Sequence, residues 1–300
     1  MEEGRPSATA ISTALRRAAH LVLDDDPKVF QDSLALRLSG MESEAALQAA
    51  LEAMQAENAR RSTPEVAQRV NRSARAAVVM RQRYTEDELG KALERGVTQY
   101  VILGAGLDSF AYRRPDLVTT LHVFEVDHPA TQQWKRARLR ELNIALPSNL
   151  TFVPLDFEQQ TLAEGLRAGG HRSEVSTFFS WLGVTVYLTE AAVFETLRYV
   201  ASLAPGSEIV FEYFLSESLL DEESRRGLAV AKARGASLGE PWLSQFEPSL
   251  LTARVKELGF TQVWDLGPEE ANARYFAGRT DGLRTSPVLH LMKARVGEFV

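Results

Sequence analysis

Apolar residues recur at intervals of three and four through the first hundred residues, and helix breakers such as Pro27 and Gly40 lie between the periodic segments. This spacing places apolar side chains on one face of a helix. Pro64 sits just inside the start of one segment, where its missing N–H costs nothing. We therefore predict helices over Ala10–Leu23, Lys28–Leu38 and Ala45–Ala59, and a fourth that runs from Thr63, with a break, to about Arg95.

The period changes at Gln99, where a continuous apolar run leads into glycines. Such a run is typical of a strand buried on both faces. Strand and helix patterns alternate from there, which predicts a doubly wound, mostly parallel α/β sheet. The expected strands, seven in all, lie near Tyr100–Leu103, Leu121–Val126, Leu150–Pro154, Ser176–Trp181, Glu208–Phe214, Phe260–Trp264 and Val288–Ala294, and the clearest helices between them at Pro129–Leu142, Glu190–Leu203 and Pro248–Leu258.

Composition narrows the class of protein. Apolar residues make up 45% and charged residues 25% of the chain, which is ordinary globular usage. The absence of cysteine excludes disulfides and thiolate metal sites and favours a cytoplasmic location. The sequence contains no long uncharged apolar run, so we predict no membrane span. The net charge of −6 argues against nucleic acid as a partner, because phosphate binding is driven by basic surfaces.

The strongest chemical signal is the strand Val101–Leu103 running into Gly104, Ala105 and Gly106. Glycines let the backbone approach a ligand and expose N–H groups to it. A tight strand-to-helix turn needs glycine for steric reasons alone, so this motif by itself leaves that alternative open.

A carboxylate follows the glycines at the sequence spacing that is typical of nucleoside-binding sites. Asp127 ends the next strand, about 20 residues past the glycines, where an acid can accept hydrogen bonds from ribose hydroxyls. The alternative is a helix cap, because His128-Pro129 opens the next helix. Glycine turn and acid together predict a nucleoside-binding site.

Two cofactors fit such a site, a dinucleotide and S-adenosylmethionine. A dinucleotide favours a third glycine for close approach over the pyrophosphate, and that position is Ser109 here. Asp156 and Phe157 follow the third strand, where an acid and a ring suit the adenine amino group and ring face, although Asp156 could also cap a helix over Glu158–Leu166. The pattern favours S-adenosylmethionine.

At this point the sequence resembles the leucine carboxyl methyltransferase-like family of class I methyltransferases. The resemblance implies a Rossmann-like sheet, S-adenosylmethionine as cofactor, transfer of its methyl group to oxygen, and often a carboxylate acceptor. It is carried by QYVILGAGLD (Gln99–Asp108), FEVDHP (Phe124–Pro129), Asp156-Phe157 and WLGVTVYL (Trp181–Leu188), with weaker matches at Thr9–His20 and Asp26–Leu38.

The resemblance also implies roles for individual residues. Gly104, Ala105 and Gly106 would line the methionine part of the cofactor, Asp127 would hold the ribose, and Asp156 with Phe157 the adenine. Arg81 matches an arginine that meets the cofactor carboxylate in the family, and Arg17 or Arg16 is the nearest match to a second basic residue there. Leu182 stands where many members have a glutamate, so the contact of that glutamate with the cofactor amino group is missing or relocated.

Candidate groups on the acceptor side are fewer. Tyr187 and His128 are the preferred candidates, although a core tyrosine and a helix-start histidine explain them as well. A carboxylate acceptor is ionised at neutral pH, whereas a phenol or alcohol would gain from a general base. Arg69, Arg72 and Arg75 form one stripe on a helix, which is either a solvated face or an anion site.

We expect a helical cap over residues 1–96 and a methyltransferase domain over residues 97–300, acting on a small-molecule acceptor. The sequence gives no oligomeric state. Two other functions remain open: a non-catalytic regulator that binds S-adenosylmethionine, and an NAD-dependent oxidoreductase. A nucleic-acid methyltransferase is disfavoured because WLGVTVYL lacks an Asp/Asn-Pro-Pro-aromatic segment.

Overall fold

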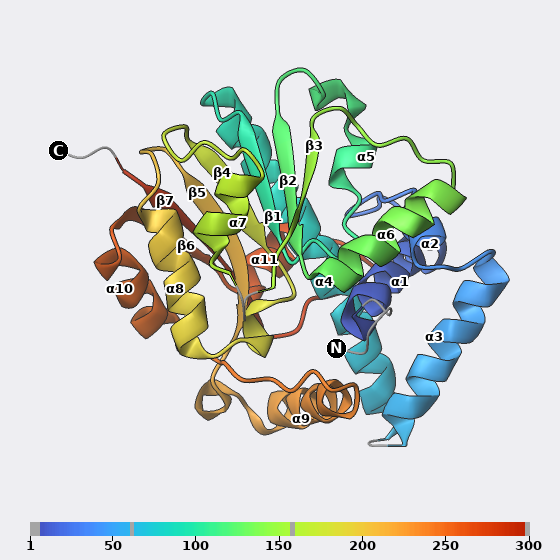
Figure 1. The fold of residues 1–300 in the computed structure, drawn as a ribbon. Helices are drawn as coiled ribbons and strands as arrows, with labels where there is room; N and C mark the ends of the chain where they lie inside the picture. The colour runs from blue at the N-terminus through green and yellow to red at the C-terminus, as the bar shows by residue number, and fades with distance from the viewer. Residues whose placement is uncertain (1–6, 61–62, 157–159, 298–300) are drawn as a thin grey trace.

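A computed structural model describes residues 7–60, 63–156 and 160–297. Its core is a seven-stranded sheet with strand order β3-β2-β1-β4-β5-β7-β6 (Figure 1). The first five strands are parallel, and β7 lies antiparallel between β5 and β6. The strands are β1 (Gln99–Leu103), β2 (His122–Asp127), β3 (Leu150–Pro154), β4 (Thr177–Trp181), β5 (Glu208–Phe214), β6 (Phe260–Leu266) and β7 (Leu289–Val296).

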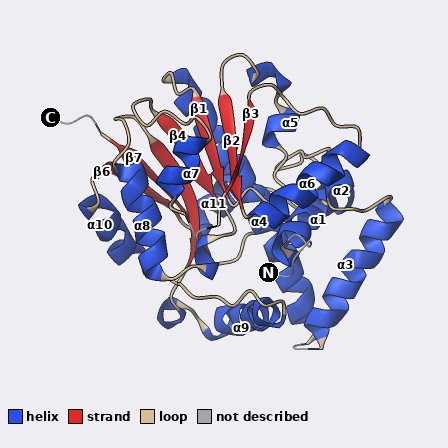
Figure 2. Cartoon of the chain, in the orientation of Figure 1, coloured by secondary structure: helices blue, strands red, loops and turns tan. Residues whose placement is uncertain are grey.

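Helices cover both faces of this sheet (Figure 2). The alternation along β1 explains why both faces need cover: Val101 and Leu103 enter one hydrophobic cluster, and Tyr100 and Ile102 enter the other. The helices between and after the strands are α5 (Phe110–Arg113), α6 (Pro129–Glu141), α7 (Leu162–Ala168), α8 (Glu190–Ala201), α9 (Glu222–Ser237), α10 (Pro248–Glu257) and α11 (Pro268–Tyr275). The predicted α/β fold with seven strands is confirmed.

Among the described residues before the sheet, the helices are α1 (Ala8–Leu23), α2 (Ala35–Leu38), α3 (Glu44–Ala59) and α4 (Pro64–Glu94). The helix α4 contacts α1 and α3, and also β4, β5 and α9, so it joins the N-terminal helices to the sheet. In Figure 1, α9 lies at the bottom of the view, beyond the lower end of the sheet. Within the described part of the chain, no helix is long and apolar enough to cross a membrane.

Two predicted helix boundaries are wrong. The helix expected over Lys28–Leu38 is present only as α2, Ala35–Leu38. Side chains hold the preceding residues in a non-helical path: His20 Nε2 accepts the amide of Val29 at 3.0 Å, and Asp32 Oδ1 accepts the amide of Leu34 at 3.1 Å. The expected break in the fourth helix is absent, because α4 is continuous over Pro64–Glu94.

Candidate cofactor and acceptor site

The glycine turn after β1 adopts a conformation that ordinary side chains avoid. Gly104 and Gly106 have φ of +65° and +47°, in the left-handed region that favours glycine. A Cβ atom on Gly104 would also overlap Cγ2 of Val184, from the segment after β4. The turn therefore needs glycine at position 104 for both its backbone and its neighbour.

We expect Gly104→Ala to weaken S-adenosylmethionine binding about tenfold to thirtyfold. The added methyl group forces either Val184 or the turn to move, and an L-residue at positive φ costs about 1–2 kcal/mol. Isothermal calorimetry measures the affinity, with Gly40→Ala as the control, because a Cβ there meets nothing within 4 Å although φ is +87°. Equal affinities for both variants and the wild type would contradict this account of the turn.

Asp127 lies at the end of β2, directly against the glycine turn. Its carboxylate accepts the backbone amide of Gly106 and, at 2.7 Å, that of His128. Burial raises the pKa of Asp127, and the two amides oppose that shift. The alternative role as a helix cap is wrong, because His128 is the N-cap of α6 and its Nδ1 accepts the amide of Ala130 at 3.2 Å.

A cavity of about 570 Å³ opens at this turn, and we name it the glycine-turn cavity. Its size is within the range of about 300–1,000 Å³ that holds small ligands. The predicted cofactor residues that line it are Arg17, Arg81, Gly104, Ala105, Gly106, Asp127, Asp156 and Leu182. Phe157 lies outside the described residues. Asp156 does not cap α7, because that helix begins at Leu162 with Thr161 as its N-cap.

The two predicted arginines are held in different ways. Arg17 donates to Asp32 Oδ2 at 2.8 Å and to the carbonyl oxygen of Leu107 at 2.6 Å, which ties α1 to the turn. Arg81 donates from Nη1 to both carboxylate oxygens of Glu212, at 2.8 Å each. The buried Nε atom of Arg81 has no hydrogen-bond partner among the described residues. A buried donor without a partner is costly, so Arg81 keeps capacity for an anion.

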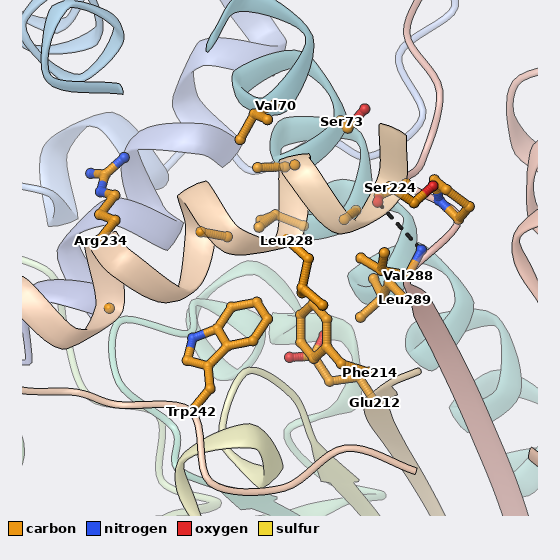
Figure 3. Close-up of a pocket in the computed structure, with 18 of the residues that line it drawn as sticks. Val70, Ser73, Glu212, Phe214, Ser224, Leu228, Arg234, Trp242, Val288 and Leu289 are labelled. Carbon is orange, nitrogen blue, oxygen red and sulfur yellow. Dashed lines mark hydrogen bonds between the residues drawn. The ribbon is translucent and has the colours of Figure 1, made fainter. Parts of the chain in front are cut away.

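A second cavity, of about 470 Å³, lies between α4, α9 and the segment that leads into β7, and we name it the α9 cavity. Figure 3 shows Phe214 and Trp242 below α9, with Leu228 of that helix close to Phe214; Val70 of α4 lies above α9, and Arg234 extends upward from α9, away from Trp242. Both cavities are lined by Thr9, Thr13, Arg81 and Tyr187. A ligand in one cavity can therefore meet a ligand in the other at these four side chains.

The hydroxyl of Tyr187 lies 3.5 Å from Thr9 Oγ1. Burial raises the pKa of Tyr187 above its ordinary value, so at neutral pH the phenol can donate a hydrogen bond but does not act as a base. His128, the other predicted acceptor-side residue, lines the glycine-turn cavity and not the α9 cavity. In the described part of the chain, no cluster of three or more His, Asp or Glu side chains could hold a metal ion.

Two of the three arginines in the α4 stripe pair with acids. Arg69 pairs with Glu223 of α9, and Arg75 donates to Asp24 at 2.6 Å and 2.8 Å. Both pairs join α4 to a neighbouring segment. The sequence patterns did not single out α9 or the residues Phe214, Arg234 and Trp242 as part of a site, because their approach to α4 depends on tertiary packing.

The fold and the glycine-turn cavity define a Rossmann-like α/β protein with a ligand site at the carboxyl ends of its parallel strands. A sequence model of the family described as leucine carboxyl methyltransferase matches residues 10–201. The chain is 38% identical over 214 residues to YktD of Bacillus subtilis, provisionally named an S-adenosyl-L-methionine-dependent methyltransferase; the match covers 70% of this chain and 69% of YktD. A Mycolicibacterium vanbaalenii relative with the same provisional name is 31% identical over 180 residues, covering 60% of this chain and 56% of that protein.

Two solved structures share the fold. A provisionally named methyltransferase from Thermobifida fusca superimposes with a TM-score of 0.60 and 14% identity, covering 99% of this chain and 97% of its own. A DUF574 family protein from Streptomyces avermitilis gives a TM-score of 0.55 and 14% identity, and the match covers 87% of this chain and 94% of that protein. The chain belongs to the leucine carboxyl methyltransferase family, as the sequence predicted.

Proposed function

We propose that this protein transfers the methyl group of S-adenosylmethionine to a carboxylate oxygen of a small molecule. Membership of the family makes it an S-adenosylmethionine-dependent methyltransferase; the carboxylate and the small-molecule acceptor are the proposal. The cofactor would occupy the glycine-turn cavity and the acceptor the α9 cavity. The expected split into a helical cap over residues 1–96 and a catalytic domain over residues 97–300 is part of the proposal.

The cavity residues fit the cofactor. Gly104 and Gly106 line the cavity without side chains, so the methionine part can approach the backbone of the turn. Asp127 can accept ribose hydroxyls, since a carboxylate has more acceptor positions than its two amide contacts use. The buried Nε of Arg81 can donate to a carboxylate. When bound, the cofactor supplies an electrophilic methyl group on a sulfonium.

Among the described residues, four side chains are common to both cavities, and they determine which acceptor can be held there. They are two threonines, Arg81 and Tyr187, and none of them can take a proton at neutral pH. Methyl transfer to a carboxylate releases no proton, whereas transfer to a phenol or alcohol does. An arginine and a phenol at this junction can orient an acceptor that is already an anion, and positioning then supplies much of the rate.

A labelled-methyl assay tests the proposal. The enzyme is incubated with [methyl-14C]S-adenosylmethionine and a set of small carboxylic acids, phenols and alcohols, and the products are treated with mild alkali. Methyl esters then release labelled methanol, whereas methyl ethers keep the label. We expect base-labile label from acids alone. Base-stable label would assign a hydroxyl acceptor, and cofactor binding without any product would favour a non-catalytic regulator.

A further inference from the structure

The α9 cavity differs in chemistry between its wall and its junction with the glycine-turn cavity. Most of its wall is apolar: the rings of Phe214 and Trp242 stack with centroids 4.3 Å apart, and Leu228 lies opposite them (Figure 3). Arginine side chains line the cavity as well. Arg16 of α1 is within electrostatic range of Arg81, Arg234 and Tyr187, which places it near the junction.

In the described part of the chain, Arg16 lacks the carboxylate partner that several neighbouring arginines have. Arg17, Arg75 and Arg81 each pair with a carboxylate. Within the described residues, the hydrogen bonds of Arg16 go to the carbonyl and hydroxyl oxygens of Ser12, one turn earlier in α1, and no carboxylate pairs with it. Burial and the neighbouring cations lower its pKa to about 9. An anion in the cavity would relieve that repulsion.

An apolar cavity with a cation near one end matches a molecule that is apolar along its length and anionic at one end. We propose that the α9 cavity binds amphiphilic carboxylic acids, with the carboxylate against Arg16 and the apolar body against Phe214, Leu228 and Trp242. This inference rests on the proposed function, because it treats the α9 cavity as the acceptor side. It adds the class of acid and the residue that recognises it.

The transfer balances without a base or a co-reactant. A lone pair of the bound carboxylate forms the new O–CH3 bond while the methyl–sulfur bond breaks, and the electron pair of that bond stays on sulfur. The sulfonium becomes a neutral thioether, the acid becomes a neutral methyl ester, and no proton moves. Arg16 and Tyr187 would hold the oxygen that carries the charge.

Calorimetry with three probes tests binding without turnover. Sodium octanoate, octan-1-ol and sodium butanoate are titrated into the full chain at saturating S-adenosylhomocysteine. We expect octanoate to bind at least tenfold more tightly than octan-1-ol, because of the charged contact. We also expect it to bind at least tenfold more tightly than butanoate, because each fully buried methylene is worth about fourfold in affinity.

Arginine variants separate recognition from folding. Arg16→Met is expected to lower octanoate affinity at least tenfold and to leave octan-1-ol unchanged, and Arg16→Lys is expected to restore part of the loss. Arg226→Met is the matched control, because Arg226 lies on α9 with its side chain 70% exposed and does not line the cavity. It should bind octanoate as the wild type does.

The possible results separate this inference from the proposed function. Equal binding of octanoate and octan-1-ol by the wild type, or equal losses in the Arg16 and Arg226 variants, would overturn the inference. Methylation of acids that is insensitive to Arg16→Met would also overturn it while leaving the proposed function intact. Arg16-dependent binding of octanoate with no acid methylated would support the cavity assignment and contradict the proposed function.

Discussion

Asp127→Ala is expected to weaken S-adenosylmethionine binding at least about 100-fold. The side chain would lose its hydrogen bonds to the ribose, and charged hydrogen bonds contribute about 1.5–3 kcal/mol each. The substitution also leaves the amides of Gly106 and His128 without their shared acceptor, so the conformation of the glycine turn is less well fixed. Isothermal calorimetry with S-adenosylmethionine and S-adenosylhomocysteine measures the loss.

Two further variants make that result specific. Asp127→Asn keeps the volume and one oxygen acceptor, so we expect a smaller loss of about tenfold. Asp116→Ala is the control, because this aspartate is exposed and paired with Arg114 on the loop before β2. Binding by Asp127→Ala that equals the wild type, with an unchanged melting temperature, would exclude Asp127 from the cofactor site.

Lys135→Met is expected to lower the free energy of unfolding by about 3–5 kcal/mol, the usual cost of removing one partner of a buried ion pair. Lys135 of α6 donates to Glu125 of β2 at 2.6 Å, and both side chains are almost completely buried. Without the lysine, Glu125 must either stay charged with no counterion or take up a proton, and both cost stability. Urea unfolding followed by circular dichroism measures the change.

The pH dependence of this variant identifies the cause. Burial already raises the pKa of Glu125 to about 7 in the wild type, and loss of Lys135 raises it further. A pKa raised on folding contributes stability that is present below the unfolded pKa and is lost as pH rises through the folded pKa. The deficit of Lys135→Met should therefore be smaller at pH 5 than at pH 8. The double variant Glu125→Met/Lys135→Met should recover most of the stability, and a deficit equal at both pH values would contradict this explanation.

The parts that the sequence predicted well are those that local pattern determines. The run Val101–Leu103 is buried because its side chains enter hydrophobic clusters on both faces of the sheet, and a continuous apolar run encodes that burial. Gly104 and Gly106 mark a turn that needs positive φ. Asp127 reaches the turn because β1 and β2 are adjacent and parallel, which the alternation of strands and helices implies.

The acceptor side depends on contacts between distant segments, which a single sequence does not reveal. Arg16 comes within electrostatic range of Arg81 and Arg234 only because α4 packs against both α1 and α9. The pair Arg81–Glu212 joins residues that are 131 positions apart. The non-helical path before α2 arises from side-chain acceptors on His20 and Asp32, and helical periodicity over Lys28–Leu38 gives no sign of that competition.

A crystal structure of the protein with S-adenosylhomocysteine tests the central claim most directly, namely that cofactor and acceptor occupy two cavities that meet at Arg81 and Tyr187. The account predicts the adenosine part beside Asp127, the homocysteine sulfur facing the junction, and the α9 cavity left for the acceptor. S-adenosylhomocysteine bound in the α9 cavity, or with its sulfur facing away from Arg81 and Tyr187, would contradict the account.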